Sequence, residues 1–285
     1  MSPPRDAHFL HAQRALEPVL AAPIEAPRAM TWVPRREELL VASASGAVTC
    51  VEPSFGSRVL WTGVPDPSSL DASAELVAVL GTTGTLEVWN RATRQRERLL
   101  ETGLNGDAEV HLVGDRVLVI GDGRGGRRVR VYAGDSLEMD ASVPSGTAAG
   151  DVEGIRVARS LITGVVTVPL GYPLPEEPAT GHSIRFVGPR LLGVAVGGAT
   201  VWENGSPLSF RLLDTSAAAL TADGQFVALG TFGGLVAICG VGAAPKDRAH
   251  PPRVSAHEGV VRALAFSDRG RWLATVGENC RIWAY

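Results

Sequence analysis

Cysteine is scarce in this sequence, with three in 285 residues. So few thiols cannot form the dense disulfide framework of a small secreted domain. They are Cys50, Cys239 and Cys280, far apart in the chain and without the Cys-x-x-Cys spacing of zinc sites or redox pairs. Each lies in a short apolar run, so we expect three buried, reduced thiols.

Long apolar runs are absent as well. No segment approaches the roughly 20 apolar residues that a membrane-spanning helix needs. The N-terminal stretch MSPPRDAHFLHAQ lacks the continuous apolar region of a signal peptide. We therefore expect a cytoplasmic protein without membrane contact. Its frequent Ala, Arg, Gly and Pro are typical of a GC-rich bacterial genome.

An excess of charge of one sign is also missing. The chain has 27 Lys and Arg against 30 Asp and Glu, a formal net charge of −3. It therefore has no overall attraction for nucleic acid or anionic membranes. The basic run Arg91–Arg98 contains no aromatic residue on which a base could stack. We expect it on an outer strand, where charge discourages edge-to-edge pairing, and we predict no nucleic-acid partner.

Catalytic and metal-binding signatures are missing too. The six histidines show neither HExxH nor HxH spacing, and the sequence contains no Gly-x-Ser-x-Gly nucleophile elbow. Several carboxylates near the expected repeat entries lack matching histidines and are interpreted as solvated loop acids: Asp71, Asp107, Asp151, Glu153 and Asp214. We therefore predict no catalytic residue, no metal and no cofactor.

One glycine-rich segment needs separate consideration. DGRGGRRVRV, residues 122–131, combines Gly-x-Gly-Gly with arginines at positions 124, 127, 128 and 130. Guanidinium groups and backbone N–H groups can hold phosphate. However, no helix follows and no Gly-Lys-Ser/Thr is present, so this is neither a P-loop nor a dinucleotide fingerprint. We expect an extended, solvated turn, with an acidic partner protein as a more suitable ligand than a nucleotide.

Glycine-punctuated short strands are what the sequence does contain. A turn glycine precedes a bulky strand residue by five positions in four places: Gly46 and Val51, Gly84 and Trp89, Gly197 and Trp202, Gly233 and Ile238. With Tyr132 and Trp283, this column of bulky residues is spaced by 38, 43, 70, 36 and 45 positions. The interval of 70 holds two repeats, which gives seven units. The period suits propeller blades of four strands.

The last and fourth units depart from this pattern. The last unit has three strands, VVRALAF, RWLATVG and CRIWAY, and an open ring would leave their edges unpaired. We predict that residues 11–20 supply the missing outer strand and close the ring, with residues 1–10 as a flexible tail. A short helix also fits residues 11–20. The fourth unit, between Gly146 and Gly181, is irregular, so six blades with a long insertion is the competing count. The Pro-rich segment 243–253 is expected to be stiff and exposed.

These residues resemble the WD40-repeat propellers. In the last unit FSDRG is similar to the FSPDG of the family, Ala256-His257 stands for Gly-His, and Trp283-Ala284 stands for Trp-Asp. The resemblance recurs as Gly181-His182 with Trp202-Glu203, and as Trp89-Asn90. It implies an all-β fold: one seven-bladed β-propeller domain over residues 1–285, with four-stranded antiparallel blades, in a divergent bacterial member.

The family holds its blades with a hydrogen-bonded tetrad of His, Ser/Thr, Asp and Trp. Here His257, Thr275 and Trp283 match three members, and Glu278 or Asn279 stands for the Asp. The resemblance also implies structural roles for His182, Trp202 and Trp89. No unit has the full set, so apolar packing is expected to hold most blades.

This fold favours a non-catalytic scaffold or adaptor, a monomeric propeller that binds one or more proteins within a larger complex. The loops between second and third strands and those between blades are expected on one face, where side chains vary without disturbing the packing. The candidate contact residues are Arg28, Thr83, Arg124, Arg127, Glu153, Arg185, Phe232, Glu258, Arg262 and Glu278. The alternatives are a propeller hydrolase or lyase with a site at the central channel, and a sensor of small ligands or glycans.

Overall fold

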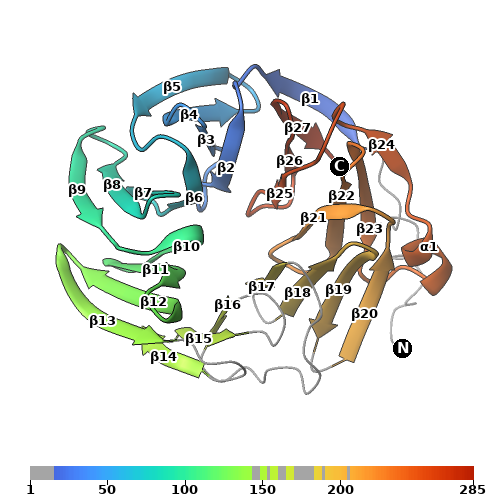
Figure 1. Cartoon of the computed structure of the whole chain (residues 1–285). Coiled ribbons are helices and arrows are strands. Elements are labelled where there is room, and N and C mark those ends of the chain that lie inside the picture. The colour runs from blue at the N-terminus through green and yellow to red at the C-terminus, as the bar shows by residue number, and fades with distance from the viewer. Residues whose placement is uncertain are drawn as a thin grey trace, which may run out of the picture.

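The computed structural model describes residues 16–142, 148–152, 155–159, 165–169, 183–187, 190–203 and 206–285. Within these residues the strands form seven antiparallel sheets, six of four strands and one of three. Figure 1 shows them arranged radially around one centre.

The first three sheets follow the chain in order. The first contains β2 (Pro27–Trp32), β3 (Leu39–Ser43), β4 (Ala47–Glu52) and β5 (Gly56–Thr62); the second contains β6 (Pro67–Ala72), β7 (Leu76–Gly81), β8 (Thr85–Asn90) and β9 (Arg96–Glu101); the third contains β10 (Asn105–Val113), β11 (Arg116–Gly123), β12 (Gly126–Ala133) and β13 (Ser136–Ser142). In each, the first strand lies nearest the centre and the last lies at the rim (Figure 1).

The later sheets continue the series. The fourth has β14 (Ala148–Val152), β15 (Ile155–Arg159) and β16 (Val165–Pro169); the fifth has β17 (Ser183–Val187), β18 (Arg190–Ala195), β19 (Gly198–Glu203) and β20 (Ser206–Arg211); the sixth has β21 (Thr215–Leu220), β22 (Phe226–Thr231), β23 (Leu235–Gly240) and β24 (Arg253–Ser255). The irregular fourth unit of the sequence is therefore a sheet, with three strands among the described residues.

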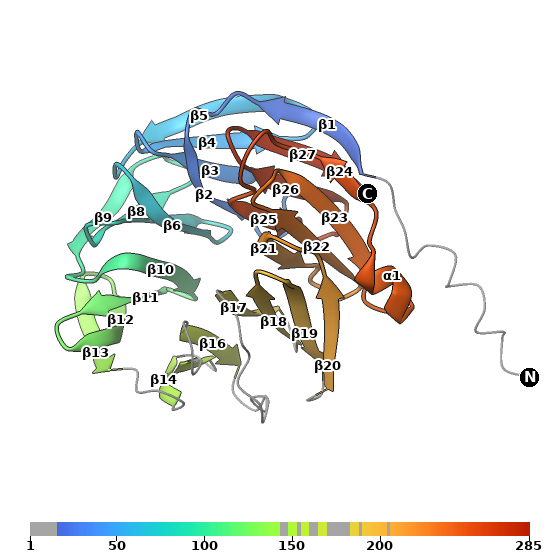
Figure 2. The ribbon, with the colours of Figure 1, turned by 45° about the vertical axis from the view of Figure 1, so that its right-hand side comes forward.

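The seventh sheet joins the two ends of the chain. It contains β25 (Ala263–Phe266), β26 (Trp272–Val276) and β27 (Cys280–Ala284), with β1 (Glu17–Ala22) as its outer strand. β1 runs antiparallel to β27, with Glu17 opposite Ala284 and Ala22 opposite Cys280, and Figure 2 shows the two side by side. The predicted pairing is present, but the strand starts at Glu17, later than the predicted span of 11–20. Residues 1–15, with the predicted tail, lie outside the described residues.

The apolar core lies between neighbouring sheets. One cluster joins Leu40 and Val48 of the first sheet to Val77 and Val79 of the second. Another cluster joins Leu39 and other residues of the first sheet to the seventh sheet, so strands near the two ends of the chain pack against each other. Inner strands are apolar on both faces because each face packs against a neighbouring sheet. All five residues of β3, for example, are buried.

The structure adds detail to two local expectations. The Pro-rich segment 243–253, which was expected to be stiff and exposed, contains the short helix α1 (Pro245–Ala249) at the rim beside β23 and β24 (Figures 1 and 2). Proline suits the first turn of a helix, where its missing N–H has no partner to lose. The first strand of the last unit is also shorter than VVRALAF. The N–H of Val261 bonds the carbonyl of Thr231 in the sixth sheet, so residues before Ala263 form a loop.

Candidate partner-binding face

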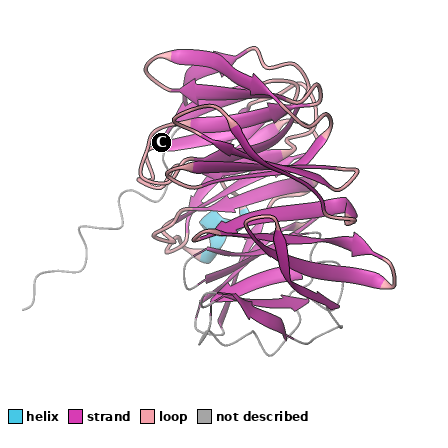
Figure 3. Ribbon diagram, turned by 90° about the vertical axis from the view of Figure 1, so that its left-hand side faces the viewer, coloured by secondary structure: helices cyan, strands magenta, loops and turns pink. Residues whose placement is uncertain are grey.

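The loops between second and third strands and the loops between sheets lie on one face of the disc. Backbone hydrogen bonds join the two kinds of loop directly: Gly63 N–H bonds Gly46 O, Thr102 N–H bonds Gly84 O, and His257 N–H bonds Gly234 O. In the side view of Figure 3, loops and turns line the two opposite faces and strands run between them. We call the face that carries these bonded loops the loop face.

Most of the predicted contact residues lie at the loop face. Arg28 is at the start of β2 and pairs with Asp66 at 3.2 Å. The others are in the loops or at the adjoining strand ends: Thr83, Arg124, Arg127, Phe232, Glu258, Arg262 and Glu278. Glu153 lies outside the described residues, and Arg185 lies in β17. The set therefore forms two groups, one over the first three sheets and one over the sixth and seventh.

The seventh sheet contains a chain of side-chain contacts. Trp283 Nε1–H donates to Thr275 Oγ1 at 3.0 Å, and Thr275 Oγ1 lies 2.8 Å from His257 Nε2. On the other side of the ring, His257 Nδ1 lies 3.3 Å from Glu278 Oε2. A neutral imidazole with its proton on Nδ1 lets the Thr275 hydroxyl donate to Nε2 while accepting from Trp283. Of the two candidates for the Asp position, the structure places Glu278 next to the histidine.

The electrostatics of this chain suit a neutral histidine. Burial lowers the pKa of His257, and the Glu278 carboxylate only partly opposes that shift. Burial raises the pKa of Glu278, but backbone N–H donors and His257 outweigh it, so the pKa of Glu278 is lowered. Glu278 is thus ionised at neutral pH. Glu278 therefore contacts the buried His257 of the seventh sheet while it lies in a loop of the loop face.

Trp89 makes a different set of contacts, which sequence reasoning missed. Its Nε1–H donates to Glu87 Oε2 at 2.9 Å, and Arg96 Nη1 donates to Glu87 Oε1 at 2.7 Å. Glu87 is buried, and the Trp89 ring stacks on Trp61 of the first sheet at 5.1 Å. The available signal was an acid two residues before the tryptophan in TLEVWN, on the same face of the strand. Trp202 lies in β19 opposite Leu191, and His182 lies outside the described residues.

Four exposed apolar side chains gather on neighbouring loops of the loop face. Val196, Leu213, Phe232 and Val260 are exposed by 46%, 82%, 51% and 39%. Their loops are joined through the backbone: Thr215 N–H bonds Val196 O, Phe232 N–H bonds Asp214 O, and Val261 N–H bonds Thr231 O. We call these four residues the apolar patch. The other large exposed apolar residues of the described part lie on outer strands or, for Phe55, in the turn between β4 and β5.

The innermost strands β6 and β10 also carry polar side chains that form contacts. Asp71, expected to be a solvated loop acid, instead lies in β6 with both carboxylate oxygens hydrogen-bonded. Oδ1 accepts from Ala72 N–H, and Oδ2 accepts from Leu112 N–H of the next sheet at 2.8 Å. Burial raises the pKa of Asp71. This carboxylate therefore joins the second and third sheets.

His111 follows on β10, with Nε2 3.5 Å from Glu109. Burial alone would lower the pKa of His111, but the Glu109 and Asp71 carboxylates together outweigh it and the net shift is upward. No group of three or more His, Cys, Asp or Glu side chains suited to a metal ion occurs among the described residues.

All three thiols are buried and free. Burial raises the pKa of Cys50 and Cys239 to about 11, and that of Cys280 to about 12. Glu38 and Glu52 add to the shift at Cys50. Since the thiolate is the reactive form, these cysteines are inert at neutral pH.

Comparison with known proteins bears on the fold. No protein-family model matches the chain, and no curated protein sequence matches it. The β-propeller domain of Cps50 (Swd1) from Myceliophteria thermophila matches it with a TM-score of 0.68 and 11% identity, covering 95% of this chain and 100% of that one. Raptor from Chaetomium thermophilum matches with a TM-score of 0.71 and 15% identity, covering 97% of this chain and 29% of Raptor. At these identities the likeness shows the fold alone, a β-propeller.

In the part of the chain that the structure describes, no helix is long and apolar enough to cross a membrane.

Proposed function

We propose that this chain is a non-catalytic scaffold or adaptor, a single WD40-like propeller domain that binds a partner protein through its loop face. In this proposal the seven sheets are the blades of one ring, closed by β1, in a cytoplasmic bacterial protein. The apolar patch is the observation that supports binding. Apolar side chains grouped on a polar surface are typical of protein contact sites.

The patch is well suited to bind without reorganisation. Its four loops belong to neighbouring sheets and are tied together by backbone hydrogen bonds at 2.8 to 3.0 Å. A partner therefore does not have to order them, which lowers the entropic cost of association. The surrounding loops carry the charged residues Asp214, Glu258 and Arg262, and a polar rim around an apolar centre is the usual anatomy of an interface.

Phe232 is the proposed anchor. Its N–H is bonded to Asp214 O on one side, and the adjoining Thr231 accepts from Val261 N–H on the other. The loop that carries Phe232 thus lies between the loops of Leu213 and Val260. A half-exposed aromatic in a fixed loop loses little conformational freedom on binding and gains a large buried area.

The linked side-chain contacts of the seventh sheet support the WD40 resemblance. His257, Thr275 and Trp283 meet through hydrogen bonds of 2.8 and 3.0 Å, and Glu278 completes the set. This arrangement fixes the loop 256–262 to β26 of its own sheet, through Thr275, and to the turn after β26, through Glu278. It therefore holds the Val260 side of the apolar patch in place.

Capture of partners from the native host tests the proposal. The wild-type protein, Phe232→Ala and Phe55→Ala are each immobilised, and bound proteins are identified by mass spectrometry. Phe55 is a matched control, since it is the same residue type, 86% exposed and outside the patch. We expect Phe232→Ala to weaken one specific partner about tenfold or more with an unchanged melting temperature, and Phe55→Ala to bind normally. Equal capture by all three proteins would contradict the proposal.

A further inference from the structure

The loop face carries a second feature, a cavity whose lining side chains, among the described residues, are all arginine. It has a volume of about 260 Å³ and is lined by Gly103, Arg124, Arg128 and Arg130. Gly103 lies in the loop between β9 and β10, and the arginines come from the β11–β12 hairpin. We propose that this cavity, the arginine pocket, is an oxyanion site that takes a phosphoryl group.

The hairpin has a tighter geometry than the sequence suggested. Gly123 pairs with Gly126, so only Arg124 and Gly125 form the turn. The glycine-rich segment is therefore not an open solvated loop, and it does not present a run of free backbone N–H groups to a phosphate. Its guanidinium groups are left as the recognition elements.

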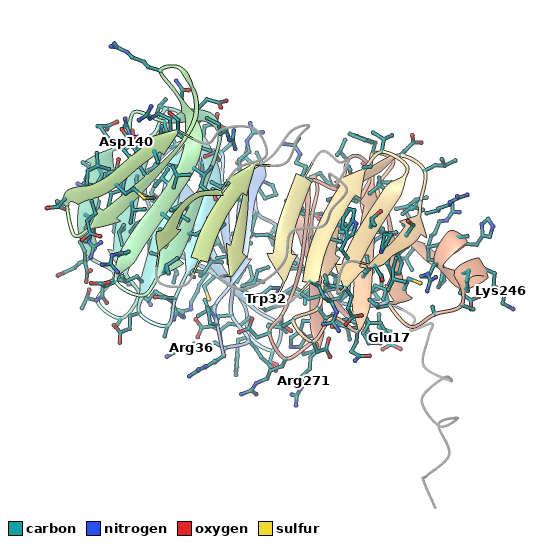
Figure 4. All side chains as sticks on the ribbon, turned by 90° about the horizontal axis from the view of Figure 1, so that it is seen from below. Glu17, Trp32, Arg36, Asp140, Lys246 and Arg271 are labelled. Atoms are coloured by element: carbon teal, nitrogen blue, oxygen red, sulfur yellow. The ribbon has the colours of Figure 1, made fainter. Side chains whose placement is uncertain are left out.

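One carboxylate holds two of the arginines in place. Arg128 Nε donates to Asp140 Oδ1 at 2.7 Å, and Arg130 Nη2 donates to Asp140 Oδ2 at 3.0 Å. Arg130 Nη1 also donates to the carbonyl of Thr102. Asp140 lies on β13, and Figure 4 labels it on the third sheet. Guanidinium groups held this way are oriented before a ligand arrives, which reduces the entropy lost on binding.

Positive charge remains in excess after these contacts. Among the described residues, Asp140 is the carboxylate that pairs with the lining arginines, so one negative charge stands against three guanidinium groups. Within the described residues the Arg124 side chain makes no ion pair, and it is exposed at the tip of the turn. Arg127 does not line the cavity, and it contacts Asp122 at 3.5 Å. A second anion is therefore the complement that this cavity lacks.

Two glycines provide the room that the arginines occupy. A Cβ atom at Gly103 would lie 3.0 Å from Arg130 Nη1, and the φ of +62° at Gly103 also disfavours a side chain. A Cβ atom at Gly123 would lie 2.8 Å from Arg128 Cδ. The backbone on both sides of the cavity thus allows the guanidinium groups to lie across it.

A phosphoryl group fits this arrangement better than a carboxylate. It carries close to two negative charges at neutral pH and three terminal oxygens, one for each guanidinium group. A carboxylate offers two oxygens and one charge, the complement that Asp140 already supplies. Arginine is also the side chain best matched to phosphate through paired N–H donors. The pocket lies over the third sheet, away from the apolar patch, and the inference does not depend on the proposed function.

The test measures binding of two probes to the full-length protein by calorimetry: inorganic phosphate and a short peptide that contains phosphoserine. A peptide with glutamate in place of the phosphoserine is the chemical control. We expect saturable binding of at least one phosphorylated probe and weaker binding of the glutamate peptide. Similar affinity for both probes indicates a free phosphate compound as the source, whereas binding of the peptide alone indicates a phosphorylated protein.

Variants locate the site. Arg124→Gln removes a guanidinium group that makes no ion pair within the described residues, so we expect affinity to fall about tenfold or more with an unchanged melting temperature. Arg94→Gln is the matched control, because Arg94 is exposed in the turn between β8 and β9, at the opposite face, and makes no ion pair within the described residues. Arg128→Lys keeps the charge but loses the fork and is also expected to weaken binding. The inference would be overturned if neither probe showed saturable binding, or if the glutamate peptide bound as tightly as the phosphoserine peptide. It would also be overturned if the Arg124 and Arg94 variants lost affinity equally.

Discussion

Replacing Thr275 with valine is expected to destabilise the protein although the two side chains have nearly the same shape. Thr275 is fully buried, and its hydroxyl is the shared partner of Trp283 Nε1–H and His257 Nε2. Valine would leave both of these groups without a hydrogen bond inside the blade. Each buried unsatisfied group costs about 1–3 kcal/mol, so the expected loss is about 3 kcal/mol in the free energy of unfolding.

Equilibrium unfolding in urea at pH 7.5 measures this effect, with Thr275→Ser as the control. Serine keeps the hydroxyl and loses one methyl group, which costs about 1 kcal/mol. The hydrogen-bond argument therefore expects serine to be the milder change, whereas apolar packing and strand propensity alone would favour valine. A valine variant as stable as the wild type, or more stable than the serine variant, would refute the reasoning.

Two further predictions concern the same sheet. Burial lowers the pKa of His257 below the ordinary histidine value of about 6.5, so the unfolded chain binds a proton that the folded one does not, and stability falls as the pH drops below about 6.5. Urea unfolding at pH 5.5 and 7.5 should show a larger loss of stability for the wild type than for His257→Gln. The pKa of His111 is shifted upward, so His111 contributes with the opposite sign, and only the difference between the two proteins reports on His257. Equal losses of stability in the two proteins would contradict the assignment. Removing residues 1–22 deletes β1 and exposes the edge of β27, so the free energy of unfolding should fall by about 3 kcal/mol or more, and removing residues 1–10 should leave it unchanged. Equal unfolding midpoints for the two truncated proteins would show that β1 does not stabilise the seventh sheet.

The sequence predicted the strands well where the signal was local. Each turn glycine lies within a few residues of the buried strand that follows it. The column of repeated bulky residues therefore predicts where β4, β8, β19, β23 and β27 lie. The thiols were predictable for the same reason: each lies inside a third strand that packs on both faces. The segment 243–253 was harder because proline is compatible with both an extended loop and the first turn of α1.

The candidate sites depended on contacts between distant residues. Val196, Leu213, Phe232 and Val260 show no common pattern in the chain, and they form one patch because loops of neighbouring sheets bond to each other. The arginines of residues 122–131 were visible, but Asp140 and Gly103, which make their cavity, lie on other strands and loops.

The sequence by itself determined the repeat and the strand order within it, since both are set by spacing along the chain, and its resemblance to WD40 repeats indicated the histidine, threonine and tryptophan of the last unit. Only the tertiary structure decided that Glu278 faces His257, that Asp71 joins two sheets and that three arginines surround one cavity. The physical reason is that the direction of a side chain at a loop or strand end is set by packing against neighbouring sheets. That packing is absent from any local stretch of sequence.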